Sequence, residues 1–195
     1  MNIEEIRRLD QKLNDSKLLI AEPFMPNNSP FKRAVILLCQ HNQEDGSLGF
    51  IINKSLKIPV NNLLASFPEI ESDVLYGGPV GNDSLHYIHN VGHLLPNSIK
   101  IGDGIYWGGD FEEMRTLVMA KIITPDNIRF FLGYSGWGAG QLRDEMTNSS
   151  WMLGHLDPNY IFNSEHNETL WEKALKNEGG TLRIISEIPK DLPWN

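Results

Sequence analysis

Four glycines lie close together at positions 133, 136, 138 and 140, between an apolar run and a segment with helical spacing. Glycine permits positive φ and close approach of backbone N–H groups to a ligand, and a helix that follows such a turn favours anions at its N-terminus. The spacing matches neither G-x-G-x-x-G nor a P-loop, because no Lys-Ser/Thr pair follows. The segment therefore predicts either a backbone cradle for a ligand or a tight strand-to-helix crossing in which Trp137 fills the core.

Ser135 lies inside this segment and is a candidate nucleophile. The α/β-hydrolases expose their serine at a sharp turn between a strand and a helix, but within G-x-S-x-G, whereas this chain has G-x-S-G-W. His155 or His166 would act as the base, with Asp144 or Asp157 as the third member of a triad. A hydrolase that uses Ser135 is therefore one alternative function.

Three histidines, His86, His89 and His93, are spaced three and four residues apart, which on a helix would place them on one face. The local sequence favours a strand instead, in which His86 and His89 point to opposite faces. A single cysteine, Cys39, excludes a multi-cysteine zinc site, and its apolar surroundings predict a buried side chain. His41 ends the same apolar run, where a strand-end hydrogen-bonding role is the expectation. We therefore predict no metal site and no cofactor.

The composition limits the classes of partner. The 195 residues include 25 acidic and 17 basic side chains, which gives a net charge of -8, and no Lys/Arg cluster stands out. Direct DNA binding is therefore a disfavoured alternative, because it depends on basic groups that replace counterions on phosphate. The longest apolar run, 34–39, is too short to span a membrane, and the N-terminus lacks the apolar core of a secretory signal. We expect a cytoplasmic protein that makes no membrane contact.

Apolar periodicity and turn residues predict the elements that position these groups. Strands are expected at 18–21, 34–39, 48–53, 74–76, 84–89, 105–107, 128–134, 151–153 and 160–162, and helices at 1–16, 58–67, 110–121, from 141 onwards and at 168–177, before a C-terminal tail at 181–195. The segments 34–39 and 48–53 should pair as an antiparallel hairpin. Runs of strands interrupted by isolated helices favour one α+β domain over residues 1–195.

Several segments, in order along residues 17–180, carry a resemblance to a known family. They are Leu18–Pro23, Val35–Cys39 with His41-Asn42, Gly49–Lys54, Gly77-Gly78-Pro79-Val80 and Gly133–Leu142. The chain resembles the YqgE/AlgH family of bacterial proteins. The resemblance implies a single α+β domain with coiled, bifurcated mixed β-sheets flanked by helices. Family members are often labelled transcriptional regulators without an assigned activity, and they usually carry Ala or Ser at position 135, which weakens the hydrolase alternative.

The resulting hypothesis is a non-enzymatic cytoplasmic module that binds a small ligand or a protein partner and has an indirect regulatory role. Its site would combine the two glycine-rich turns, where binding groups are held by a rigid scaffold. The predicted site residues are Asn53, Gly77, Gly78, Tyr134, Gly136, Trp137, Gly138 and Gln141. The glycines would supply backbone donors, and the tyrosine, tryptophan and amides would supply stacking and hydrogen bonds. A buried Trp137 and no cleft between the turns would contradict this site.

Overall fold

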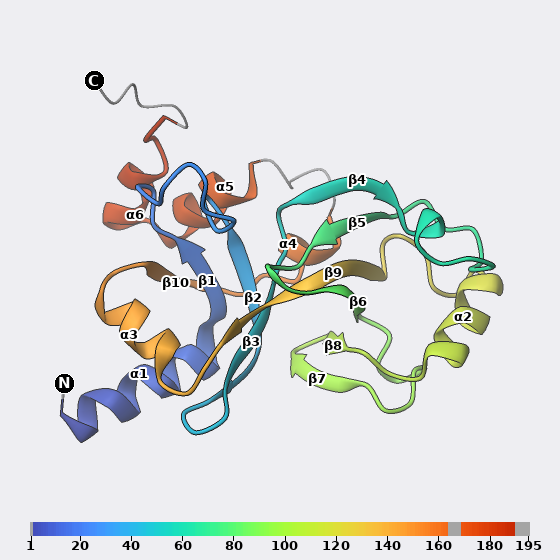
Figure 1. Ribbon diagram of the computed structural model, residues 1–195, viewed down its shortest axis with the longest axis horizontal. Coiled ribbons are helices and arrows are strands. Elements are labelled where there is room, and N and C mark those ends of the chain that lie inside the picture. Colours follow the sequence, from blue (N-terminus) through green and yellow to red (C-terminus); the bar gives the residue numbers. More distant parts are fainter. Residues whose placement is uncertain (1, 164–168, 190–195) are drawn as a thin grey trace.

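The computed structural model describes residues 2–163 and 169–189, and its elements follow one another as α1 (Ile3–Ser16), β1 (Lys17–Ala21), β2 (Val35–Asn42), β3 (Gly46–Ile51), β4 (Ser55–Pro59), the 3₁₀ turn η1 (Val60–Asn62), β5 (Asp73–Tyr76), β6 (Val80–His89), β7 (Ile99–Gly102), β8 (Ile105–Trp107), α2 (Phe111–Met119), β9 (Ile128–Trp137), α3 (Gln141–Thr147), β10 (Trp151–His155), α4 (Asn159–Phe162), α5 (Leu170–Glu178) and α6 (Gly180–Ile185). In Figure 1, the helices α1, α3, α5 and α6 gather at one end of the molecule and α2 lies at the other. The strand β9 runs between the two ends.

The strand β9 joins two halves of one sheet. Within the described residues the main path is β10-β1-β2-β3-β9-β6-β8-β7, and β5 pairs with both β4 and β9. The C-terminal part of β9 pairs with β3, whereas its N-terminal part pairs with β6 on one side and with β5 on the other. The sheet therefore divides at β9.

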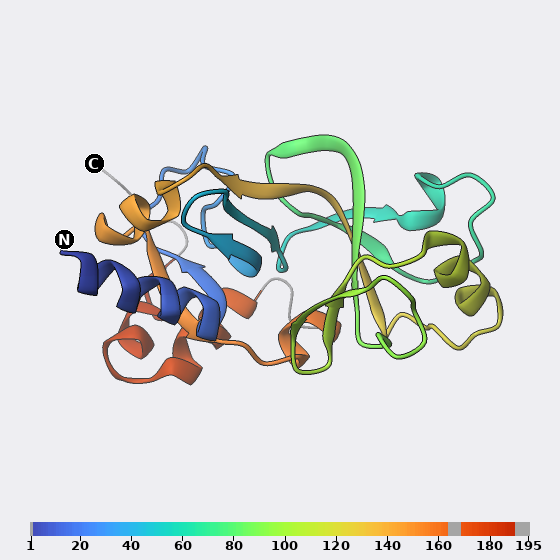
Figure 2. The same cartoon turned by 90° about the horizontal axis from the view of Figure 1, so that it is seen from below.

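The expected α+β single domain is confirmed, but the expected mixed sheet needs a correction. Among the described strands, β5 and β9 form the single parallel pair, and the other pairings are antiparallel. The sheet is a curled, essentially antiparallel one, seen from a second direction in Figure 2. Short hairpins join β2 to β3 and β7 to β8, and such connections require antiparallel pairing.

The first half of the sheet is buried on both faces. In β1, Leu18 and Ile20 belong to the hydrophobic cluster that includes Trp171 of α5, whereas Leu19 and Ala21 belong to the cluster under α1 and α3. This alternation follows from the period of two in a strand. Because both faces are covered, the strand sequence is continuously apolar rather than alternating.

The second half has its own core beneath α2. Met114 and Val118 of this helix pack with Val74 of β5 and Phe130 of β9. The side chain of Asp110 accepts a hydrogen bond from the Glu113 N–H at 2.9 Å, which caps the helix. None of the helices in the described ranges is long and apolar enough to cross a membrane.

Three of the expected elements are wrong. Residues 58–67 form no α-helix: β4 ends at Pro59, and a single 3₁₀ turn covers Val60–Asn62. Val60 donates its N–H to the Ser72 carbonyl at 2.9 Å. Residues 160–162 belong to α4 rather than to a strand. The expected C-terminal tail begins with α6, and residues 190–195 lie outside the described residues. Short apolar runs do not distinguish a strand from a buried helix by periodicity alone.

Candidate functional site

The two glycine-rich segments meet, but their backbones pack directly against each other. A Cβ atom on Gly77 would lie 2.1 Å from the Gly133 carbonyl oxygen, and one on Gly78 would lie 2.3 Å from the Tyr134 carbonyl carbon. Both distances are far below van der Waals contact. Glycine is therefore needed here so that two strands can approach, and no cleft separates the two segments at this point.

The polar groups of Gly77 are already used inside the protein. Its N–H donates to the Leu132 carbonyl at 2.9 Å, and its carbonyl accepts from the Ile51 N–H at 3.0 Å and from Ser135 Oγ at 3.1 Å. Gly77 therefore has no free backbone donor for a ligand, contrary to the role expected from the sequence. Gly77 therefore has a structural role, because its hydrogen bonds connect β3 to β9.

The same contacts correct the hydrolase alternative. Ser135 is completely buried within β9 rather than exposed at a turn, so no substrate can reach its hydroxyl. His155 is exposed and its Nδ1 lies 2.8 Å from Glu178 Oε2, while His166 lies outside the described residues. Asp157 is engaged with the backbone N–H of Asn159 at 2.9 Å. Ser135 therefore has no access to a substrate, and the described residues show no base for it.

Trp137 fills the core, as the alternative interpretation of the glycine segment predicts. Its side chain is 5% exposed, and Nε1 donates to Glu145 Oε2 at 2.8 Å. Gln141 accepts from the Gly138 N–H at 3.0 Å and donates to Glu145 Oε1 at 2.9 Å, so its amide closes the turn before α3. Since β9 continues to Trp137, the turn itself is limited to residues 138–140.

The remaining predicted site residues lie in different places. Asn53 joins β2 to the end of β3, because its Oδ1 accepts from the Val35 N–H at 2.8 Å and its Nδ2 donates to the Arg33 carbonyl at 2.9 Å. Residues of the glycine segment, together with the β2–β3 hairpin, line an open hollow of about 390 Å³: Tyr134, Gly136, Trp137, Val80, Gln40, Asp45, Gly46, Ser47 and Leu48. Three of the eight predicted residues therefore share this hollow, and the other five do not line it.

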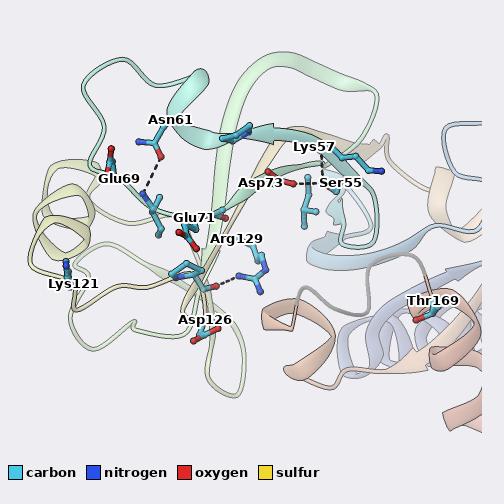
Figure 3. A pocket seen from close by; sticks show the side chains of 15 residues that line it. Ser55, Lys57, Asn61, Glu69, Glu71, Asp73, Lys121, Asp126, Arg129 and Thr169 are labelled. Atoms are coloured by element: carbon cyan, nitrogen blue, oxygen red, sulfur yellow. Dashed lines mark hydrogen bonds between the residues drawn. The ribbon is translucent and has the colours of Figure 1, made fainter.

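A much larger groove, of about 1290 Å³, lies between the β4–β5 hairpin and the start of β9 (Figure 3). Eleven of its fifteen lining residues are polar or charged. The lining comprises Ser55, Lys57, Pro59, Asn61, Glu69, Ile70, Glu71, Ser72, Asp73, Leu75, Lys121, Pro125, Asp126, Arg129 and Thr169. In Figure 3, Arg129 lies in the middle of this set, with Lys57 and Thr169 on the side away from Lys121. The groove is the candidate site.

Arg129 is the buried charged residue of the groove. The residue as a whole is only 6% exposed. Its Nη1 donates to the carbonyls of Pro125 and Ile128, the latter at 2.8 Å, and its Nη2 donates to the Phe162 carbonyl. In residues 2–163 and 169–189 no carboxylate lies within ion-pair distance of it. Burial lowers the pKa of Arg129, and the nearby charge of Asp126 opposes that shift.

The wall of the groove is held in place by Asn61. Its Nδ2 donates to the carbonyls of Phe67 and Pro68, each at 3.0 Å, and its Oδ1 accepts from the Ile70 N–H at 3.3 Å. Ile70 is buried beneath this loop. The groove is therefore a preformed feature of the fold, which is what a rigid binding site requires.

A second polar cluster has the order of a catalytic triad. His41 Nδ1 lies 2.7 Å from Ser47 Oγ, and His41 Nε2 lies 3.1 Å from Asp10 Oδ1. The space beside the three residues is about 10 Å³, which is roughly the room that one water molecule needs. No acyl group fits there, so the cluster instead ties α1 to the β2–β3 hairpin. This agrees with the strand-end hydrogen-bonding role expected for His41.

The sequence carries one signal that points to the groove. Arg129 interrupts the apolar run 128–134, and a charged side chain inside a buried strand is unusual. Lys57 and Asp73 gave no such signal, because exposed charged residues are common. Their neighbourhood follows from the pairing of β4 with β5, which the expected helix at 58–67 concealed.

The family assignment agrees with this architecture. Residues 18–183 match the AlgH-like family, DUF179. The chain belongs to the AlgH-like family. It is similar to a UPF0301 protein of Chlorobium limicola, 41% identical over 92% of this chain and 94% of the relative, and to one of Cytophaga hutchinsonii, 39% identical over 92% and 97%. The names of these relatives assign no activity.

Two solved structures share the fold of this AlgH-like chain. A Corynebacterium diphtheriae protein matches with a TM-score of 0.71 and 21% identity, covering 88% of this chain and 90% of its own. The AlgH protein of Pseudomonas aeruginosa matches with a TM-score of 0.68 and 24% identity, covering 90% and 94%. At these identities the likeness establishes the fold and no function.

Proposed function

We propose that this AlgH-like protein is a non-enzymatic, cytoplasmic binding module whose groove receives an extended segment of a protein partner. The observation that carries the proposal is the preformed groove of about 1290 Å³ with Arg129 at its centre. Pockets for small molecules are usually roughly 300–1,000 Å³ and mainly apolar. A larger, open groove with seven charged lining residues is better suited to a polypeptide with charged side chains.

A regulatory role would then be indirect. The net charge of -8 opposes contact with a nucleic acid, since binding to phosphate depends on an excess of basic groups. Four carboxylates line the groove, Glu69, Glu71, Asp73 and Asp126, beside three cations, Lys57, Lys121 and Arg129. The groove itself is therefore not suited to an anionic polymer such as a nucleic acid. Any effect on transcription would pass through the bound protein.

The test uses selection of random peptides displayed on phage against the full chain, followed by affinity measurements with the synthetic peptides. Glu71→Trp places a large side chain in the groove, and Glu44→Trp is the matched control in the β2–β3 loop, because both glutamates are exposed. We expect the first variant to weaken binding about tenfold or more and the second to leave it within about twofold. Failure to select any peptide, or equal affinities for both variants, would contradict the proposal.

A further inference from the structure

The guanidinium of Arg129 has donors to spare. Arginine carries five N–H groups. Of the three bonds to backbone carbonyls, Nη1 makes two, to Pro125 and Ile128, and Nη2 makes one, to Phe162. The Nε–H and the second Nη2–H have no acceptor among the described residues. These two donors sit on neighbouring nitrogens of a planar group, a spacing that two oxygens of one anion can match.

Among residues 2–163 and 169–189, no carboxylate forms an ion pair with Arg129. Backbone carbonyls satisfy hydrogen bonds but carry no net charge, and a buried ion without a counterion is costly to the fold. The side chain of Asp126, which is exposed, influences Arg129 electrostatically without forming an ion pair with it. A bound anion would supply the missing charge. The three carbonyl contacts would keep the guanidinium in place before binding, which lowers the ordering cost.

We infer that Arg129 is the anchor of the groove and binds a carboxylate of the partner segment, either an Asp or Glu side chain or a free C-terminus. The inference rests on the proposed function and names its recognition chemistry. A phosphate group is the poorer fit, because its second negative charge would face the acidic lining residues Glu71, Asp73 and Asp126. The same acidic residues favour lysine or arginine elsewhere in the segment, so the partner sequence combines one acidic anchor with basic neighbours.

The experiment is affinity selection of two synthetic random octapeptide libraries on the full-length protein, one with free C-terminal carboxylates and one with C-terminal amides. We expect retained peptides to favour Asp and Glu over Asn and Gln at one position by about tenfold, or the free-acid library over the amide library by the same factor. The first result identifies a side chain as the source of the carboxylate, and the second identifies the C-terminus.

Arg129→Lys keeps the charge but removes the planar guanidinium, and we expect it to reduce either preference about fivefold or more. Arg115→Lys on α2, outside the groove, is the matched control and should change nothing.

Two outcomes separate this inference from the proposed function. If peptides bind in the groove without an acidic preference, or if the preference persists in Arg129→Lys, the anchor role is wrong and the binding module stands. If no peptide is retained by the wild type, both fail. Because loss of the carbonyl contacts can unfold the variant, the wild-type Nε–H signal of Arg129 is also followed by NMR. It should shift on addition of an acidic retained peptide and remain unchanged with its Asn or Gln counterpart; an equal response to both peptides overturns the inference.

Discussion

Glu145 holds two buried tryptophans, and its removal should destabilise the fold strongly. Its Oε2 accepts hydrogen bonds from Nε1 of Trp137 and Nε1 of Trp151, each at 2.8 Å. The two residues are 5% and 3% exposed, so the indole N–H groups would be left with little access to water. A hydrogen bond to a charged group contributes roughly 1.5–3 kcal/mol. Since Glu145 itself is partly exposed and water can enter part of the gap, we expect Glu145→Ala to lower the free energy of unfolding by about 3 kcal/mol.

Urea denaturation followed by far-UV circular dichroism measures this change without depending on tryptophan emission. Glu145→Gln should cost about half as much, because an amide oxygen still accepts from the indoles but without charge. Asp144→Ala is the matched control: this exposed neighbour makes no side-chain hydrogen bond within the described residues and should cost at most about 1 kcal/mol through the helix dipole. A loss for Glu145→Ala no larger than that of the control would refute the reasoning.

Three further predictions concern the glycine contacts, pH and the thiol. Gly77→Ala should destabilise the fold by about 3 kcal/mol or more, because the new Cβ would lie 2.1 Å from a backbone oxygen. In Gly138→Ala the new Cβ would lie 3.9 Å from its nearest neighbour, so the loss of stability should be under about 1 kcal/mol. Thermal unfolding compares the two variants. Burial lowers the pKa of His89 from 6.5, so the unfolded chain takes up protons first and stability falls as pH drops below that value, by up to about 1.4 kcal/mol per unit. Titrating the urea midpoint should give a flatter acid slope for His89→Gln than for the exposed His93→Gln; equal slopes would argue against a neutral buried His89. Burial also raises the pKa of the Cys39 thiol, so iodoacetamide should label it only after unfolding, and rapid labelling of the native protein would contradict its burial.

The strands of the first half could be predicted because their residues are buried on both faces. Val35 to Cys39 is a continuous apolar run, and such a run has few other stable environments in a chain of this composition. The cap of α2 was also predictable, since Asp110 acts through a residue three positions away. Local signals were sufficient wherever the deciding contacts lie within one element.

The site depends on contacts that no local pattern records. The sequence of the glycine-rich segment predicts either a ligand cradle or a tight crossing with Trp137 in the core. In the structure, Gly133 lies in a strand and faces the backbone at Gly77, more than fifty residues earlier in the chain. The groove exists because β5 pairs with two strands, in parallel with β9 and antiparallel with β4. Only this pairing brings Lys57 and Arg129 to one surface. Sequence spacing predicts neither the pairing nor the resulting hollow.

The position of β9 in the sheet has a consequence during synthesis of the chain. Its partners β3, β5 and β6 all leave the ribosome earlier. The first strand, β1, also waits for a late partner, because it pairs with β10, where Lys17 lies opposite His155. Until residue 137 has emerged, those earlier strands lack the neighbour that completes them. Exposed strand edges invite pairing with other chains, and distant pairings form slowly. A nascent chain stalled before β9 is therefore the form most prone to aggregate, and the one most dependent on a chaperone.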